Sequence, residues 1–72
     1  MSLYRLQVDL RDVLLVEELL NDDPYYRQLS RPFSDVWEFE GEYDTCLDFQ
    51  DAVECLLTDT GLGYEQNVWE TA

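Results

Sequence analysis

The chain has 72 residues, 46% of them hydrophobic, which predicts one small domain spanning residues 1–72. Seventeen Asp and Glu residues stand against four Arg, with no Lys and no His, so the net charge is −13. This charge excludes direct binding to nucleic acid, because nothing in the chain could neutralise a row of phosphates. It also argues against docking on an anionic membrane. Without His or Lys, the commonest general bases, imine-forming amines and metal ligands are missing.

The N-terminal segment and the cysteines bear on the compartment. No apolar stretch in residues 1–20 resembles a secretory signal, since the longest aliphatic run is Val13–Val16. We therefore expect a cytoplasmic protein, in the host cell if the chain is phage-encoded. Cys46 and Cys55 are expected as reduced thiols, although an oxidising compartment would allow a disulfide between them. Two Cys without His cannot make a zinc site alone, and no metal or cofactor is expected.

The first half of the chain predicts a strand, a helix and a short helical turn. Apolar residues alternate with polar ones at Tyr4, Leu6, Val8 and Leu10, which indicates a half-buried strand. Asp12 can cap the helix that follows, and one face of that helix is apolar, formed by Val13, Val16, Leu19 and Leu20. Asp23 and Pro24 predict the cap and first position of a helical turn over 25–29, and Pro32 ends this connector.

Residues 35–47 allow two interpretations. Val36 to Tyr43 has the pattern of a second strand, interrupted by Gly41. A three-residue loop at 40–42 would make a hairpin whose strands share one apolar face, formed by Trp37, Phe39, Tyr43, Thr45 and Leu47. This loop usually prefers Gly in the third position rather than the second. One long strand therefore remains the alternative to a hairpin.

The remaining sequence predicts a second helix and a last strand. Asp48 is expected to cap a helix whose apolar side is formed by Phe49, Ala52, Val53, Leu56 and Leu57. Thr60-Gly61 indicates its C-terminal end, and Tyr64–Glu70 alternates as a strand. The order β-α-β-β-α-β predicts an α+β, ferredoxin-like domain: a sheet of three to four strands with two helices on one face.

The acids are unevenly distributed. Residues 1–31 carry six acids and all four Arg, a net charge of −2, whereas residues 32–72 carry 11 acids and no base. Eight acids fall within 20 residues, and these are the candidate partner-binding residues: Asp35, Glu38, Glu40, Glu42, Asp44, Asp48, Asp51 and Glu54. Glu38, Glu40 and Glu42 are expected to point the same way along one strand, about 6.6 Å apart. This spacing is similar to that of neighbouring phosphates along a nucleic-acid backbone.

Other roles for the acids fit less well. Paired carboxylates can hydrolyse glycosides, but so small a domain has little volume for a cleft that excludes water. Asp48–Asp59 has the length of an EF-hand loop, yet it has Val53 where that loop needs Gly and Asp59 where it needs Glu. We therefore expect no enzyme. Solubility or adaptation to high salt would also explain the acids, although a segment of charge −11 destabilises a small core by self-repulsion.

The chain resembles the small acidic inhibitors that phages use against host defence, the anti-CRISPR and anti-restriction DNA mimics. The resemblance is one of type, based on short length, strong acidity, a mixed α+β pattern and the lack of catalytic residues. It implies a non-enzymatic inhibitor that binds a basic nucleic-acid-binding protein, such as a CRISPR effector or a nuclease, by presenting the charge of nucleic acid.

Two other hypotheses remain open at this point. An adaptor or antitoxin-like subunit would bind through an aromatic patch or a sheet edge, with the acidity serving solubility. A homodimer could complete its core by pairing edge strands. An apolar contact would persist at high salt, whereas an electrostatic one would weaken.

Overall fold

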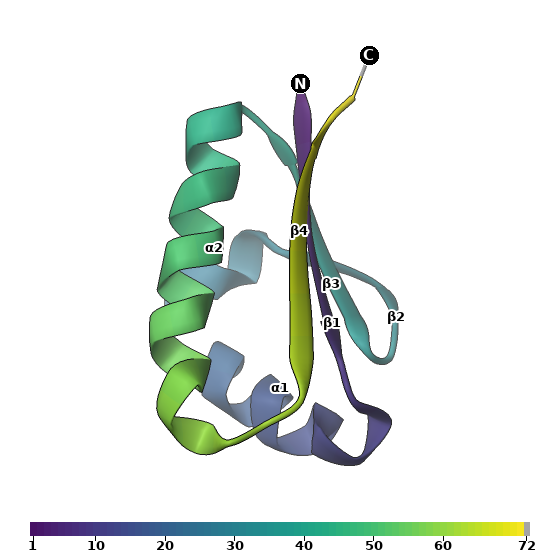
Figure 1. Ribbon diagram of the computed structural model, residues 1–72, viewed down its shortest axis with the longest axis vertical. Helices are drawn as coiled ribbons and strands as arrows, with labels where there is room; N and C mark the ends of the chain where they lie inside the picture. The colour runs from purple at the N-terminus through teal and green to yellow at the C-terminus, as the bar shows by residue number, and fades with distance from the viewer. Residues whose placement is uncertain (72) are drawn as a thin grey trace.

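A computed structural model describes residues 1–71, which form an antiparallel sheet with helices on one side (Figure 1). The sheet has the strand order β2-β3-β1-β4. The strands are β1 (Ser2–Val8), β2 (Ser30–Phe33), β3 (Val36–Gly41) and β4 (Tyr64–Glu70). The helices are α1 (Val13–Asn21) and α2 (Tyr43–Leu57), with short 3-10 helices η1 (Leu10–Asp12), η2 (Pro24–Gln28) and η3 (Thr58–Thr60). The predicted α+β class and β-α-β-β-α-β order are confirmed, and the strand order agrees with a ferredoxin-like sheet.

The central strand β1 has the predicted alternation. Tyr4, Leu6 and Val8 are buried on the side of the helices, while Arg5 faces the other way, opposite Glu38 of β3. The prediction for Leu10 is wrong: this side chain is 70% exposed. The strand ends at Val8 and the chain turns into η1, so the period-2 alternation no longer applies at Leu10.

The hairpin of the sheet lies earlier in the chain than expected. It joins β2 to β3 through the turn at Ser34 and Asp35, and β3 ends at Gly41. Pro32 lies within β2 instead of closing a connector, which is compatible with a strand at the sheet edge because Pro cannot donate to a ladder. Both expected arrangements of residues 35–47, one long strand or a hairpin at 40–42, are therefore wrong.

The second helix begins six residues before the predicted start, since its N-cap is Glu42 and the predicted cap is Asp48. Glu42 is the N-cap of α2, and Asp48 lies inside the helix instead of capping it. The earlier start places Cys46 three residues before Phe49, on the same helical face, and both side chains are fully buried. Gly61, with a φ of 70°, follows η3 in the left-handed conformation and ends the helical segment where the sequence predicts.

The core is rich in aromatic side chains centred on Phe49. Its ring centroid lies 6.1 Å from that of Tyr4, 4.7 Å from that of Tyr25 and 4.8 Å from that of Phe39. Tyr25 belongs to η2. The Asp23 carboxylate at the N-cap of this turn accepts a hydrogen bond of 3.0 Å from the Tyr25 backbone N–H. The predicted cap at Asp23 is thus confirmed, and the short turn contributes an aromatic ring to the core.

The first helix lies across the lower end of the domain, whereas α2 runs along the strands (Figure 1). Val13, Val16 and Leu20 of α1 are buried in the core. Arg31 of β2 connects α1 to the edge of the sheet. Its guanidinium is 2.9 Å from a Glu17 carboxylate oxygen and 4.5 Å from the ring centroid of Trp37.

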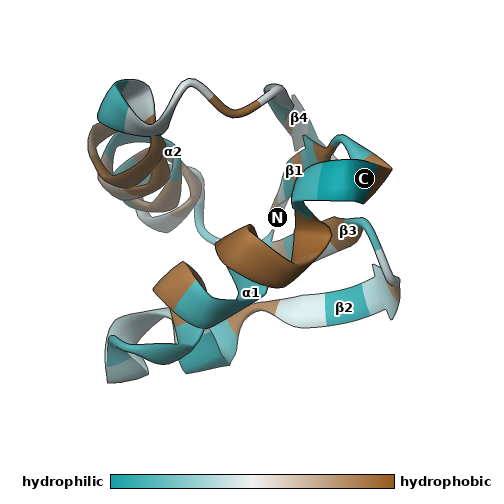
Figure 2. Cartoon of the chain, turned by 90° about the horizontal axis from the view of Figure 1, so that it is seen from below, coloured by the Kyte–Doolittle hydropathy of each residue, from teal (hydrophilic) through white to brown (hydrophobic). Residues whose placement is uncertain are grey.

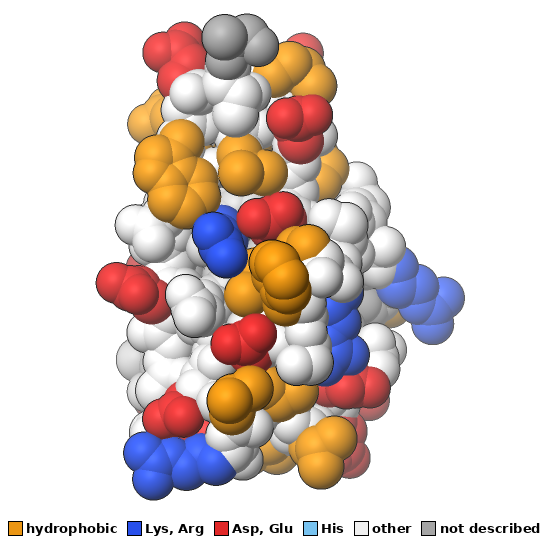
Figure 3. All heavy atoms as spheres, turned by 90° about the vertical axis from the view of Figure 1, so that its right-hand side faces the viewer, with side chains coloured by type: hydrophobic (Ala, Val, Ile, Leu, Met, Phe, Trp, Pro, Cys, Tyr) orange, Lys and Arg blue, Asp and Glu red, His pale blue; other side chains and the backbone are white. Residues whose placement is uncertain are grey.

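The opposite face of the sheet is not covered by any element in residues 1–71 (Figure 3). This open sheet face mixes apolar, acidic, arginine and neutral side chains. Trp69 of β4 lies on it opposite Leu3 of β1 and is 43% exposed. No helix in the described residues combines the length and apolar character needed to cross a bilayer.

The two cysteines cannot form a disulfide within this fold. Cys46 is buried and Cys55 is exposed. Nine residues along a helix separate them by about 13.5 Å and half a revolution, whereas a disulfide needs Cα atoms within about 7 Å. The alternative of an intrachain disulfide is therefore excluded by geometry.

Candidate functional site

The outward side of α2 gathers four of the eight candidate acids. We define the acidic face of α2 as Asp44, Asp48, Asp51 and Glu54. All four are exposed, because the opposite side of the same helix carries the residues buried against the sheet. Asp44, Asp48 and Asp51 follow one another at helical spacings of four and three residues, which places them on one stripe. Their positions along the helix axis differ by about 6 and 4.5 Å.

The acidic surface extends beyond both ends of this helix. Glu42, another candidate residue, is exposed at the N-cap. Asp59, which is not among the eight candidate acids, is exposed in η3 directly after α2. The signal that could have identified Asp59 is its position eight residues after Asp51, close to two helical turns.

The other three candidate residues lie elsewhere. Glu38 and Glu40 belong to β3 and share the open sheet face with Arg5, while Asp35 lies in the β2–β3 turn. The expectation that Glu38, Glu40 and Glu42 line one strand is wrong, because β3 ends at Gly41 and Glu42 begins a helix. The eight acids therefore do not form one continuous row. They divide between the helix side and the open side of the sheet.

Arginine neutralises acids only outside the acidic face of α2. The ion pairs of the described residues join Arg5 to Glu38, at 3.6 Å, Arg11 to Asp9, at 3.1 Å, and Arg31 to Glu17. None involves an acid of α2. Like charges three or four residues apart on a helix repel one another by about 0.2–0.5 kcal/mol per pair, so this face is held together against its own repulsion by the packing beneath it.

Burial disfavours ionisation of the core phenols and of one thiol. Burial raises the pKa of Tyr4, and the neighbouring Tyr26, Tyr64 and Tyr25 raise it further. The Tyr4 hydroxyl donates a hydrogen bond of 2.5 Å to Oε1 of Gln66. The pKa of the Cys46 thiol is also raised by burial, with backbone N–H groups of Gly41 and Tyr4 opposing this effect. These groups are therefore structural and protonated at neutral pH.

The acidic face also acts on the core below it. The pKa of Tyr25 is raised first by burial and then by the negative charge of Asp48. Tyr25 packs on Phe49, so the charges of α2 lie close to aromatic rings that anchor the helix. Asp48 therefore contributes to the electrostatic environment of Tyr25.

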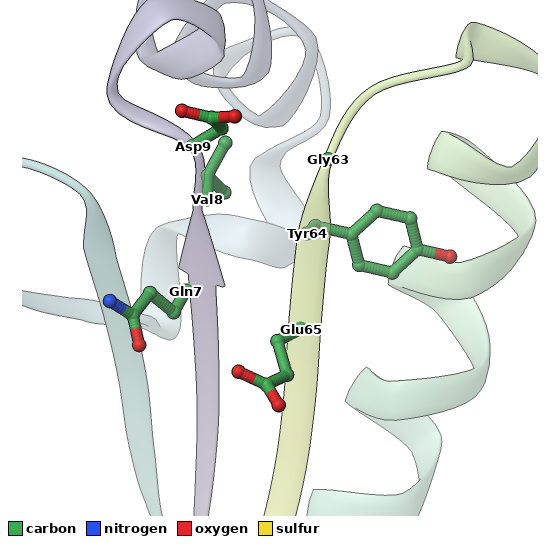
Figure 4. A pocket seen from close by; sticks show the side chains of 6 residues that line it. All are labelled: Gln7, Val8, Asp9, Gly63, Tyr64 and Glu65. Atoms are coloured by element: carbon green, nitrogen blue, oxygen red, sulfur yellow. The ribbon is translucent and has the colours of Figure 1, made fainter.

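One shallow hollow lies where β1 ends and β4 begins, and its volume is about 210 Å³ (Figure 4). It is lined by residues 7–9 and 63–65. Figure 4 shows Tyr64 pointing toward α2 and Glu65 pointing to the other side of β4. The Asp9 carboxylate accepts hydrogen bonds of 3.2 and 3.1 Å from Arg11. Sites for small molecules usually exceed about 300 Å³, so this hollow does not resemble one.

Groups of potential metal ligands give no stronger candidate for a functional site. Across residues 1–71, no group of three or more His, Cys, Asp or Glu residues could hold a metal ion. Comparisons with models of protein families, with curated proteins and with solved structures found no significant match to this chain. The acidic face of α2 is thus the candidate site that charge and geometry favour most.

Proposed function

We propose that this chain is a non-enzymatic binding protein whose acidic face of α2 occupies the basic, nucleic-acid-binding groove of a partner protein. The observation that carries the proposal is the absence of any ion pair to the acids of α2, although three Arg in the described chain pair with acids elsewhere. A Lys- and Arg-lined groove would supply the missing positive charge.

The spacing of the charges supports this partner class. The acidic face of α2 places four carboxylates within eleven residues of helix, from Asp44 to Glu54, a rise of about 15 Å. One negative charge per roughly 4–5 Å of helix axis is of the same order as the charge density of one DNA strand, which has one phosphate per about 3.4 Å of its own helix axis. The same groove that holds nucleic acid in a CRISPR effector or a nuclease would therefore attract this helix.

Association through this face would be fast and sensitive to salt. A net charge of −13 steers the chain toward a positive groove from a distance, and dissolved ions screen that attraction. Inhibition would follow from occupancy, because the partner could not hold α2 and nucleic acid in one groove together. No chemical step is required.

Two matched variants test the proposal. Asp48→Lys/Asp51→Lys reverses two charges on α2, and Glu40→Lys/Glu65→Lys reverses two exposed charges in β3 and β4. Both double variants change the net charge from −13 to −9, since each substitution adds two positive charges. With immobilised chain and host lysate at low salt, the wild-type and control proteins should retain a nucleic-acid-binding protein that elutes in a salt gradient. The α2 variant should lose it, and equal retention by both variants would contradict the proposal.

A second candidate function is an adaptor subunit that binds through the open sheet face. The observation favouring it is the exposure of Trp69, together with Phe33 of the edge strand β2, which is 62% exposed. Trp is a frequent interface anchor. A partner held by these residues would stay bound as salt rises and would be released by Trp69→Ser, which leaves every acid in place.

A further inference from the structure

The two edges of the sheet differ in how they are protected. At one edge, β2 has only four residues, contains Pro32 and departs from regular register between Ser30 and Phe33. Such features keep other chains from pairing with an edge strand. At the other edge, β4 has seven residues in unbroken register with β1 and contains no Pro. Figure 2 looks at the sheet from one end and shows β4 and β2 at its opposite sides.

Two hydrogen bonds at the ends of β4 determine which of its backbone groups face outward. The Thr71 N–H donates to the Met1 carbonyl at 2.8 Å, and the Asp9 N–H donates to the Gly63 carbonyl at 3.0 Å. In an antiparallel ladder, hydrogen-bonded pairs alternate with pairs that are not bonded. The odd-numbered positions of β4 therefore bond to β1. The backbone N–H and C=O groups that point to the outer edge are those of Tyr64, Gln66, Val68 and Glu70.

We infer that the outer edge of β4 binds an extended segment of a basic protein, which adds one strand to the sheet. Main-chain hydrogen bonds to the four outward-facing residues hold this segment, as in other cases of strand addition. The contact uses the backbone of β4, whereas the proposed function uses the side chains of the acidic face of α2. The two surfaces are separate, and neither interaction requires the other.

Charge selects a basic segment over a second copy of this chain. Glu65 and Glu70 are exposed on β4, which carries no base. Arg5 of the neighbouring strand β1 is paired with Glu38 of β3, on the side away from β4. A second copy paired edge to edge would bring up another β4 and the α2 that packs on it, and residues 32–72 carry 11 acids without a base. Lys or Arg opposite the two β4 acids instead forms cross-strand pairs of opposite charge.

The register of the added strand follows from the positions of the acids. Glu65 and Glu70 are five residues apart, so the two basic residues of an antiparallel segment are also five apart. This odd spacing places one on each face of the sheet. The residue next to the one opposite Glu70 meets Trp69, whose side chain is 43% exposed. An apolar residue at that position adds a contact on the open sheet face.

Hydrogen exchange with a synthetic peptide tests strand addition. The probe has seven residues, as β4 does, with Lys at its first and sixth positions and Val or Thr elsewhere. In the unbound chain, the amides of Gln66 and Val68 should exchange faster than those of Asn67 and Trp69, which bond to β1. At a peptide concentration about ten times Kd, exchange at Gln66 and Val68 should slow by about tenfold. A peptide of the same charge with Pro at its third and fifth positions is the control and should give no protection.

Matched charge variants of the chain test the basic character of the segment. Glu70→Lys and Glu40→Lys each change the net charge from −13 to −11, but Glu40 lies in β3, away from this edge. Glu70→Lys should bind the peptide at least about threefold more weakly than Glu40→Lys does, because it loses a cross-strand pair. Circular dichroism verifies that both variants fold.

Three results would overturn the inference. The first is unchanged exchange at Gln66 and Val68 when the Lys peptide is in excess, and the second is equal protection by the Pro peptide, which would show attraction by charge alone. The third is protection of the same amides in the chain without peptide as its own concentration rises, because a second copy would then occupy the edge.

Discussion

Tyr4 is the residue on which the core depends for both packing and pH response. Its ring is fully buried against Phe49, and its hydroxyl is bonded to Gln66. Because burial raises its pKa above the ordinary 10.0, the folded protein keeps the phenol proton when the unfolded chain releases it. Its contribution to stability is complete below about pH 10 and is lost as the pH rises further. Cys46 acts in the same direction from about pH 9.

Replacing Tyr4 by Phe separates these two effects. At neutral pH the variant should lose about 1 kcal/mol of unfolding free energy, since Gln66 loses its hydrogen bond. Above about pH 10 it should lose stability less steeply than the wild type. Urea unfolding at neutral and alkaline pH measures both changes. Tyr43→Phe, at an exposed residue of α2, is the control, and a wild-type alkaline slope in Tyr4→Phe would refute the assignment.

Gly41 is required because it lies close to the ring of Phe39, and its backbone has no positive φ. A Cβ at this position would lie 2.6 Å from a ring carbon of Phe39, which itself packs on Phe49. Gly41→Ala should therefore destabilise the fold by about 1–3 kcal/mol by displacing that ring. Gly63→Ala is the matched control, because its Cβ would meet its nearest atoms at 3.6 Å. Thermal unfolding of both variants decides the point, and equal melting temperatures would disprove it.

At the scale of single elements, α2 shows how repulsion between its acids lowers the stability of the protein. Asp51 lies three residues after Asp48 and three before Glu54, so it repels both. Asp51→Lys replaces two repulsions by two attractions and should stabilise the protein by about 1–2 kcal/mol at low salt. Asp51→Asn should give about half of this gain. Chemical denaturation at low and high salt measures it, and a gain that does not shrink at high salt would rule out an electrostatic origin.

The boundary between β3 and α2 shows where the local sequence pattern no longer predicts secondary structure. The alternation of Tyr4, Leu6 and Val8 and the bounds Tyr64–Glu70 were predictable, because each element keeps one period throughout. Residues 43–47 satisfy both a strand and a helix pattern, and packing of Cys46 into the core decides between them. Since half of the candidate acids lie next to this boundary, its position also determined which of them share a surface.

At the scale of the whole molecule, net charge governs stability as well as binding. Seventeen acids on so small a domain repel one another, and salt screens that repulsion. The melting temperature should rise between low and moderate ionic strength. It should rise less in Asp48→Lys/Asp51→Lys than in Glu40→Lys/Glu65→Lys, because Asp48 and Asp51 lie within one helical turn of other acids, whereas Glu40 and Glu65 lie in strands separated by β1. Scanning calorimetry measures the melting temperatures. Identical salt responses of the two variants would show that stability depends on the net charge alone and not on where the acids lie.

The most direct test of the central claim is a competition experiment, in which this chain and nucleic acid compete for one groove of the partner protein. The nucleic-acid-binding protein captured from lysate is loaded with fluorescent DNA or RNA, and the anisotropy is followed as this chain is added. Wild type and Glu40→Lys/Glu65→Lys should release the nucleic acid, whereas Asp48→Lys/Asp51→Lys should need at least about tenfold more protein. Nucleic acid that stays bound while wild-type chain binds beside it would contradict occupation of the groove by α2.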